Sequence, residues 1–113
     1  MENLAKEMME VLAVALGLET HFFNDFINHP ISALRALNYP PTKNLKKLNQ
    51  QRAGAHTDYG SLTILLPEPN SFGLQIFQKG KWVNVSPSED CFILNIGDLN
   101  ELWTSNRWVS TLH

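Results

Sequence analysis

Ala55-His56-Thr57-Asp58-Tyr59-Gly60 places a histidine and an aspartate two residues apart. In an extended segment, such residues point to the same side of the backbone. Both side chains can therefore reach one metal ion without distortion of the chain. A third ligand would have to come from a distant part of the sequence, and the last residue, His113, is the candidate.

Two imidazoles and one carboxylate on one face of an octahedral metal ion suit Fe(II). This ligand set leaves three positions open for a co-substrate and dioxygen. The short His-x-Asp pattern also occurs by chance, and the alternative interpretation is a hydrogen-bonded pair on a strand surface. The surrounding sequence has to decide between the two.

Length and composition narrow the classes of protein to consider. A chain of 113 residues with 43% hydrophobic and 18% charged residues is typical of one globular domain or part of one. The net charge of −2 predicts no basic surface for nucleic acid or anionic lipid. No apolar run reaches membrane-spanning length and no signal peptide is visible, so no membrane partner is expected.

The single cysteine, Cys91, cannot form an internal disulfide, which favours a reducing, cytoplasmic location. Cys91 begins the apolar run Cys91-Phe92-Ile93-Leu94. We therefore expect a buried, unreactive thiol.

The N-terminal part predicts helices. Apolar residues recur at helical spacing over residues 1–16, and Gly17 is a natural stop. A shorter helix is expected over residues 21–27. Residues 1–30 should thus form a helical buttress for the rest of the chain.

From residue 31 the pattern changes to many short strands. A polar, basic loop is expected over residues 42–54, and one helical turn over residues 98–103. Strands are expected at 33–39, 62–66, 73–78, 82–85, 91–96 and 108–113, with Lys79-Gly80-Lys81 joining two of them as a hairpin. This order predicts a mainly β fold with N-terminal helices, either a β-sandwich or a jelly roll.

Several segments together carry a resemblance to a known family. These are Leu34-Arg35-x-x-x-Tyr39-Pro40, Gly54 to Thr63 around the His-x-Asp pair, Gly73-Leu74-Gln75, Gly80-Lys81-Trp82, Gly97-Asp98, Trp103-Thr104 and Ser110-Thr111-Leu112-His113. Their content and order resemble the isopenicillin N synthase-like branch of the Fe(II)- and 2-oxoglutarate-dependent dioxygenases. The resemblance runs over nearly the whole chain and is dense from Arg35 onwards.

The resemblance implies a double-stranded β-helix, a jelly roll with iron inside, of which residues 31–113 would be a partial catalytic core in one structural domain. It assigns His56, Asp58 and His113 as the metal ligands. It also places Tyr39 beside the 2-oxoglutarate carboxylate. The alternative for Tyr39 is a strand-end tyrosine with a buried ring and a solvated hydroxyl.

The chain also departs from the family pattern. Asn100 stands where leucine or methionine is usual, and Ser105-Asn106 stands where Asn-Gly is common. Relatives carry a longer N-terminal region, and an Arg-x-Ser that binds the far carboxylate of 2-oxoglutarate comes after the distal histidine. We therefore expect a partial chain, with a jelly roll incomplete at the C-terminus and poor activity.

The function that the resemblance implies is an oxygenase. It would use Fe(II), 2-oxoglutarate and dioxygen to hydroxylate or desaturate a small organic substrate. One alternative is an Fe(II) oxidase that does not use 2-oxoglutarate, and another is a non-catalytic fragment that binds metal weakly. The sequence predicts neither the substrate nor the oligomeric state.

Overall fold

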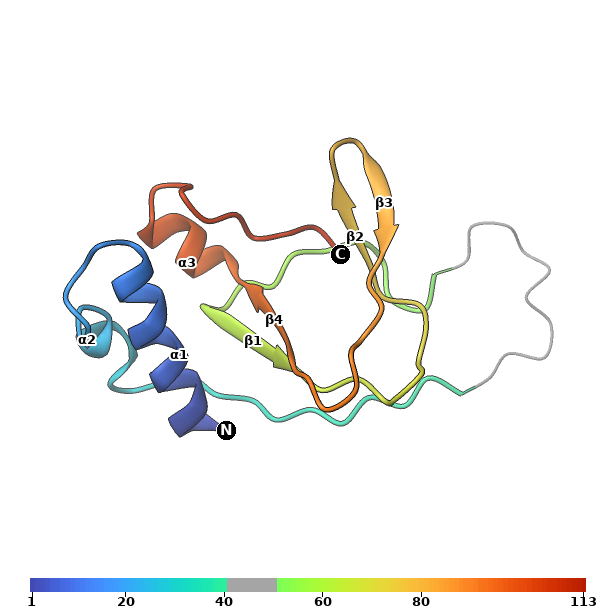
Figure 1. Ribbon diagram of the computed structural model, residues 1–113, viewed down its shortest axis with the longest axis horizontal. Coiled ribbons are helices and arrows are strands. Elements are labelled where there is room, and N and C mark those ends of the chain that lie inside the picture. Colours follow the sequence, from blue (N-terminus) through green and yellow to red (C-terminus); the bar gives the residue numbers. More distant parts are fainter. Residues whose placement is uncertain (41–50) are drawn as a thin grey trace. The chain divides into compact units, whose positions relative to one another are not determined.

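The computed structural model describes residues 1–40 and 51–113 (Figure 1). Its elements follow the order α1 (Glu2–Ala15), α2 (Asn24–Ile27), β1 (Leu62–Leu65), β2 (Gln75–Gln78), β3 (Lys81–Asn84), β4 (Ile93–Ile96) and α3 (Asp98–Trp103). The chain divides into two compact units, Met1–Lys46 and Lys47–His113. The first holds α1 and α2, and the second holds the strands and α3. The division into a buttress of residues 1–30 and a core of residues 31–113 stays a prediction.

Helix α1 ends where the sequence predicts. Gly17 has a φ of 75°, and the backbone N–H of Leu18 donates to the carbonyl of Ala13. The left-handed conformation of Gly17 lets the following N–H group donate to a carbonyl in the last turn of the helix. Met9 and Ala13 are the buried residues of this helix, while the apolar Val11 and Ala15 are exposed.

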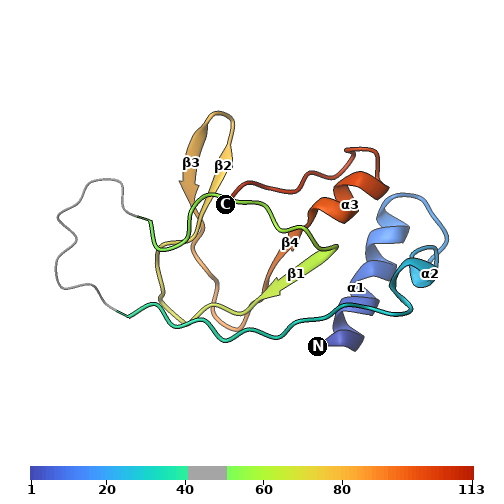
Figure 2. The same cartoon turned by 180° about the vertical axis from the view of Figure 1, so that it is seen from behind.

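In the second unit, strands β1 and β4 pair antiparallel and lie side by side (Figure 2). Leu62 faces Ile96, Thr63 faces Asn95, and the register continues to Leu65 opposite Ile93. The two strands are far apart in sequence. Their pairing places β1, which follows the His-x-Asp pair, next to β4, which precedes α3.

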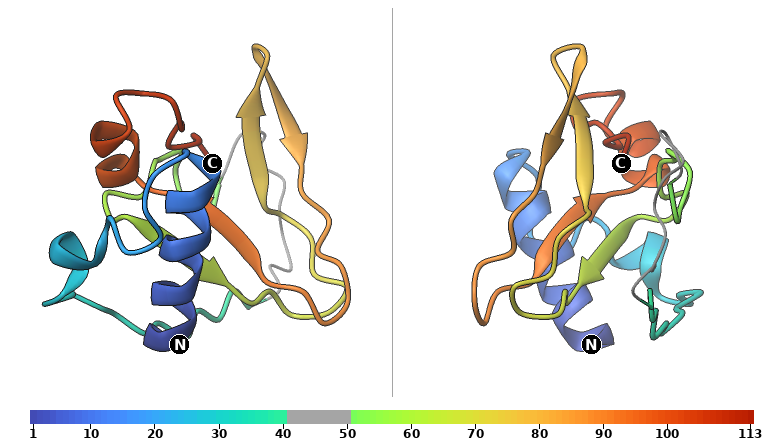
Figure 3. Two further views of the ribbon diagram at one scale, coloured as in Figure 1. Left: turned by 60° about the vertical axis from the view of Figure 1, so that its left-hand side comes forward. Right: turned by 90° about the vertical axis from the view of Figure 1, so that its right-hand side faces the viewer.

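Strands β2 and β3 form the predicted hairpin (Figure 3). Its turn consists of Lys79 and Gly80, whose φ angles are 51° and 77°. Two central residues with positive φ are typical of the type I′ turn, whose twist matches that of the flanking strands. The predicted strands were longer by one or two residues at their outer ends.

The N-terminus of α3 rests on the segment that carries Asp58. The N–H groups of Asp98 and Leu99 donate to the carbonyls of Asp58 and Gly60 at 2.7 and 3.2 Å. A helix leaves its first N–H groups without partners inside the helix, and here the neighbouring segment supplies them. The backbones approach so closely that a Cβ at Gly97 would lie 2.0 Å from the carbonyl oxygen of Gly60.

Three expectations from the sequence are wrong. Residues 33–39 form no strand, because no ladder among the described residues includes them. Residues 108–113 form no regular strand either. Cys91 is exposed, because β4 begins only at Ile93 and a turn precedes it.

The remaining expectations concern the basic loop, the turn before the last segment, membrane helices and the jelly roll. The predicted basic loop of residues 42–54 lies largely outside the described residues. Asn106 has a left-handed conformation, with a φ of 62°. Over the two described ranges, no helix combines the length and apolar character needed to cross a membrane. The two small sheets do not amount to a complete jelly roll.

Candidate metal centre

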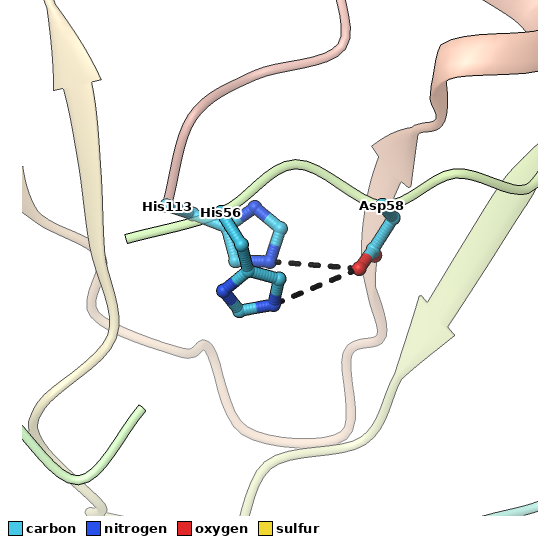
Figure 4. Close-up of side chains that lie close together, drawn as sticks. All are labelled: His56, Asp58 and His113. Atoms are coloured by element: carbon cyan, nitrogen blue, oxygen red, sulfur yellow. Dashed lines mark ion pairs between the residues drawn. The ribbon is translucent and has the colours of Figure 1, made fainter. Parts of the chain in front are cut away.

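The side chains of His56, Asp58 and His113 point towards one another (Figure 4). One ligand atom from each residue lies within 4.8 Å of the other two. The Nε2 atoms of His56 and His113 are 3.8 and 3.9 Å from Oδ1 of Asp58. Among the described residues, this is the one group of three histidine, cysteine or acidic side chains with such spacing.

Backbone hydrogen bonds bring the two histidines together. The N–H of His56 donates to the carbonyl of His113, and the N–H of His113 donates to the carbonyl of His56, both at 2.9 Å. This mutual exchange defines a hydrogen-bonded antiparallel pair, in which the two side chains lie on the same side. The ring centroids are 4.5 Å apart as a result.

Each imidazole is oriented by its own backbone. Nδ1 of His56 lies 2.8 Å from the carbonyl oxygen of Gly54, and Nδ1 of His113 lies 2.9 Å from that of Thr111. A carbonyl oxygen only accepts hydrogen bonds, so in each ring Nδ1 must carry the proton. In the neutral form, Nε2 then presents its lone pair to the centre of the cluster, as metal binding requires.

The carboxylate of Asp58 is held by two donors. The hydroxyl of Thr63 and the amide of Asn95 both donate to Oδ2, at 2.6 and 2.8 Å. Burial alone would raise the pKa of Asp58. The two hydrogen bonds and the charges of protonated His113 and His56 oppose this and hold the pKa below its ordinary value of 3.8. The carboxylate of Asp58 is therefore ionised at neutral pH.

The donor set fits a divalent transition metal ion. Two Nε2 lone pairs and Oδ1 of Asp58 converge, and the distances of 3.8 and 3.9 Å are too long for hydrogen bonds. Three acceptors facing one another repel unless a cation lies among them. Two neutral imidazoles and one carboxylate are the ligand types of non-haem Fe(II) sites.

The cluster is accessible from the side of His56. The side chain of His56 is 50% exposed, compared with 26% for Asp58 and 15% for His113. A hollow of about 380 Å³ lies near the same segment, lined by Thr57, Asp98 and Glu101 among others. None of the three clustered residues lines this hollow, so it is separate from the candidate metal centre.

The sequence prediction named the three clustered residues but missed Thr63 and Asn95. Both are polar residues inside otherwise apolar strands, and this contrast was the signal that could have found them. Tyr39 lies in the first unit, outside any helix or strand, and is half exposed. Its assignment to the co-substrate stays a prediction.

Comparison with known proteins gives a family match. Residues 28–113 match the sequence model of the 2OG-Fe(II) oxygenase superfamily. A 2-oxoglutarate-dependent dioxygenase of Penicillium crustosum, traH, is 37% identical over 109 residues, which cover 95% of this chain and 33% of the relative. The 1-aminocyclopropane-1-carboxylate oxidase 1 of Cucumis melo is 32% identical over 116 residues, covering 100% of this chain and 36% of the relative.

A solved structure has a similar fold. The crystal structure of JOX2 in complex with 2OG, Fe and JA superposes with a TM-score of 0.77 at 28% sequence identity. The match covers 97% of this chain and 32% of JOX2. The chain spans about a third of the length of the curated relatives that it matches.

Proposed function

Because this chain belongs to the 2OG-Fe(II) oxygenase superfamily, we propose that His56, Asp58 and His113 hold Fe(II) in an oxygenase. The enzyme would couple the oxidative decarboxylation of 2-oxoglutarate to the hydroxylation or desaturation of a small organic substrate. The 113 residues would supply the metal ligands and part of the surrounding protein.

One observation carries the proposal. Both histidines have Nδ1 against a backbone carbonyl, and their Nε2 atoms face Oδ1 of Asp58. A His-Asp pair on a strand surface, the alternative interpretation, would share a hydrogen between nitrogen and oxygen at less than about 3.2 Å. The longer distances, and the third acceptor from His113, favour a metal ion instead.

The bound iron, 2-oxoglutarate and dioxygen would together supply the oxidising power for attack on an unactivated C–H bond. The chain's own residues have simpler tasks. His56, Asp58 and His113 would hold the metal through one face and would leave the opposite face to the co-substrate and dioxygen. The His56 side chain is 50% exposed, so the co-substrate and substrate would reach the metal from this side.

We also propose that the second unit is part of a jelly roll with the metal between its two sheets. His56 pairs with His113, and the N–H of Phe77 in β2 donates to the carbonyl of Leu112. Two residues after His56, the carbonyl of Asp58 accepts from the N–H of Asp98, next to β4. The His-x-Asp segment thus connects the hairpin side to the β1–β4 side, as a segment between two facing sheets would.

The substrate would be a small organic molecule. The JOX2 structure contains JA together with 2OG and Fe, so one protein of similar fold binds a small molecule together with these two. By analogy, we propose a small organic substrate that approaches from the His56 side. We also propose a cytoplasmic location. Tyr39 would lie beside the 2-oxoglutarate carboxylate.

A second candidate is an Fe(II) oxidase that does not use 2-oxoglutarate. The relative from Cucumis melo carries the name of an oxidase and matches the whole of this chain. The metal ligands would be the same in both candidates. Only the response to 2-oxoglutarate separates them.

The test is a Co(II) titration of the chain under three conditions: alone, with 2-oxoglutarate and with glutarate. A co-substrate that chelates the metal through its 2-oxo group must raise the apparent affinity for the metal, by linkage. We expect 2-oxoglutarate to tighten Co(II) binding. Glutarate, which lacks only the 2-oxo oxygen, should not. Equal Co(II) affinity in all three conditions would contradict the use of 2-oxoglutarate and favour the oxidase.

A further inference from the structure

Thr63 and Asn95 form a matched pair across two strands. They are direct partners in the antiparallel β1–β4 register. Partners of this kind project from the same face of the sheet with their Cβ atoms about 4.5–5.5 Å apart. Both side chains reach the same atom, Oδ2 of Asp58, with donor–acceptor distances of 2.6 and 2.8 Å.

The two hydrogen bonds divide the roles of the carboxylate oxygens. Oδ2 accepts from a hydroxyl on one strand and from an amide on the other. Oδ1 faces Nε2 of His56 and Nε2 of His113. A carboxylate whose second oxygen is held by two charge-assisted hydrogen bonds presents a single oxygen to a metal ion.

The hydrogen bond to Asp58 determines the orientation of the Asn95 side chain. Its Nδ2 donates to Asp58, while its Oδ1 is buried and has no hydrogen-bond partner among the described residues. A buried acceptor without a partner costs free energy. Reversing the amide would place a carbonyl oxygen against the carboxylate, which costs more, so the bond to Asp58 fixes the side chain.

We propose that Thr63 and Asn95 are positioning residues that restrict Asp58 to one metal-binding oxygen, an inference that rests on the proposed iron centre. Three single-atom ligands leave three positions of an octahedral ion. A 2-oxo acid that chelates the metal would take two of them, and dioxygen would take the third. An aspartate that bound through both oxygens would leave only two positions, too few for both partners.

The first experiment compares two substitutions of Thr63, with Co(II) as the probe. Thr63→Val keeps the shape and the strand propensity of threonine but removes the hydroxyl. Thr63→Ser keeps the hydroxyl but loses the methyl group. We expect Thr63→Val to lower Co(II) affinity about 10- to 100-fold, the usual effect of removing a partner of a ligand. Thr63→Ser should stay within a few-fold of the wild type.

The second experiment uses a matched pair of asparagines. Asn84 lies opposite Gln75 in the hairpin and accepts a hydrogen bond from its side chain at 2.9 Å, so it is also part of a cross-strand polar pair. Asn95→Leu should weaken Co(II) binding as Thr63→Val does. Asn84→Leu makes the same chemical change away from Asp58 and should leave the affinity unchanged. If circular dichroism showed that Thr63→Val does not fold, the comparison of Asn95→Leu with Asn84→Leu would test the inference.

The coordination itself gives a readout that a merely structural role would not change. The d–d absorption of bound Co(II) depends on its coordination number. We expect Thr63→Val and Asn95→Leu to alter this spectrum and to reduce the gain in affinity that 2-oxoglutarate confers. Thr63→Ser should retain both properties.

Two outcomes would overturn the inference separately from the proposed function. One is wild-type affinity and spectrum in both Thr63→Val and Asn95→Leu. The other is equal damage from Thr63→Ser and Thr63→Val, which would point to packing instead of the hydroxyl. If the wild-type chain bound no Co(II), the proposed metal centre would fail and the role of the pair with it.

Discussion

His56 and His113 exchange both of their backbone hydrogen bonds, so two residues from opposite ends of the second unit form one antiparallel pair. The pairing sets the two imidazoles on the same side of the backbone, with ring centroids 4.5 Å apart. Asp58 follows His56 by two residues and therefore points to that side as well. Backbone pairing thus brings the three candidate ligands to one side of the chain.

Gly97 should be indispensable because of its close contact with Gly60. A Cβ at position 97 would lie 2.0 Å from the carbonyl oxygen of Gly60 and 2.9 Å from that of Asp58. Gly97→Ala should lower the free energy of unfolding by about 1–3 kcal/mol and weaken metal binding. Thermal unfolding and Co(II) titration measure the two effects. Gly60→Ala is the control, since a Cβ at position 60 would meet nothing within 4 Å; equal stability of both variants would contradict the contact.

The pKa of Asp58 predicts how the stability of the metal-free chain depends on pH. Burial raises this pKa, but the hydrogen bonds from Thr63 and Asn95 and the charges of protonated His113 and His56 together hold it below 3.8. A lowered folded-state pKa gives stability that is present above the unfolded value of 3.8 and lost as pH falls through the folded value. The difference in melting temperature between wild type and Asp58→Asn should therefore shrink from about pH 6 towards about pH 3, measured with chelator present. A constant difference over this range would contradict the lowered pKa.

Cys91 should react quickly with thiol reagents in the folded chain. The residue is exposed in the turn before β4, contrary to the expectation from its apolar neighbours. The labelling rate under native conditions should lie within about ten-fold of the rate in denaturant, since exposure and thiolate fraction govern this reaction. Protection of several hundred-fold would show that Cys91 is buried after all.

Tyr39 is the remaining residue assigned by family resemblance. If its hydroxyl donates to a 2-oxoglutarate carboxylate, Tyr39→Phe should weaken 2-oxoglutarate binding about ten-fold or more, the usual loss for a hydrogen bond to a charged group. Binding is measured as the 2-oxoglutarate-dependent gain in Co(II) affinity. Tyr59→Phe is the control, because it removes the hydroxyl of the other tyrosine, which is exposed beside Asp58. Equal effects of the two changes would rule out the role of Tyr39.

The sequence predicted the helices and most of the strands because their signals are local. Helical spacing before Gly17 and the turn residues Lys79 and Gly80 act within a few residues of one another. The His-x-Asp spacing is also local, and the family resemblance supplied His113. These features could therefore be read without knowing which strands pair.

The features that depend on strand pairing could not be predicted in the same way. Thr63 and Asn95 become partners only through the β1–β4 register, so their shared contact with Asp58 was missed. Residues 33–39 have a strand-like sequence, but no ladder among the described residues includes them. The burial of Cys91 was predicted wrongly because β4 begins at Ile93, two residues later than expected.

The central claim is that His56, Asp58 and His113 bind one divalent metal ion, and an isothermal titration with Co(II) tests it most directly. His56→Ala, Asp58→Ala and His113→Ala should each lower the affinity more than about 100-fold, beyond the effect of losing a partner of a ligand. His29→Ala is the control, since His29 is exposed in the first unit with its Nδ1 2.9 Å from the side-chain oxygen of Asn28. One site per chain in the wild type and in His29→Ala, lost in the other three, is the predicted result. Unchanged binding in His56→Ala and Asp58→Ala would contradict the account.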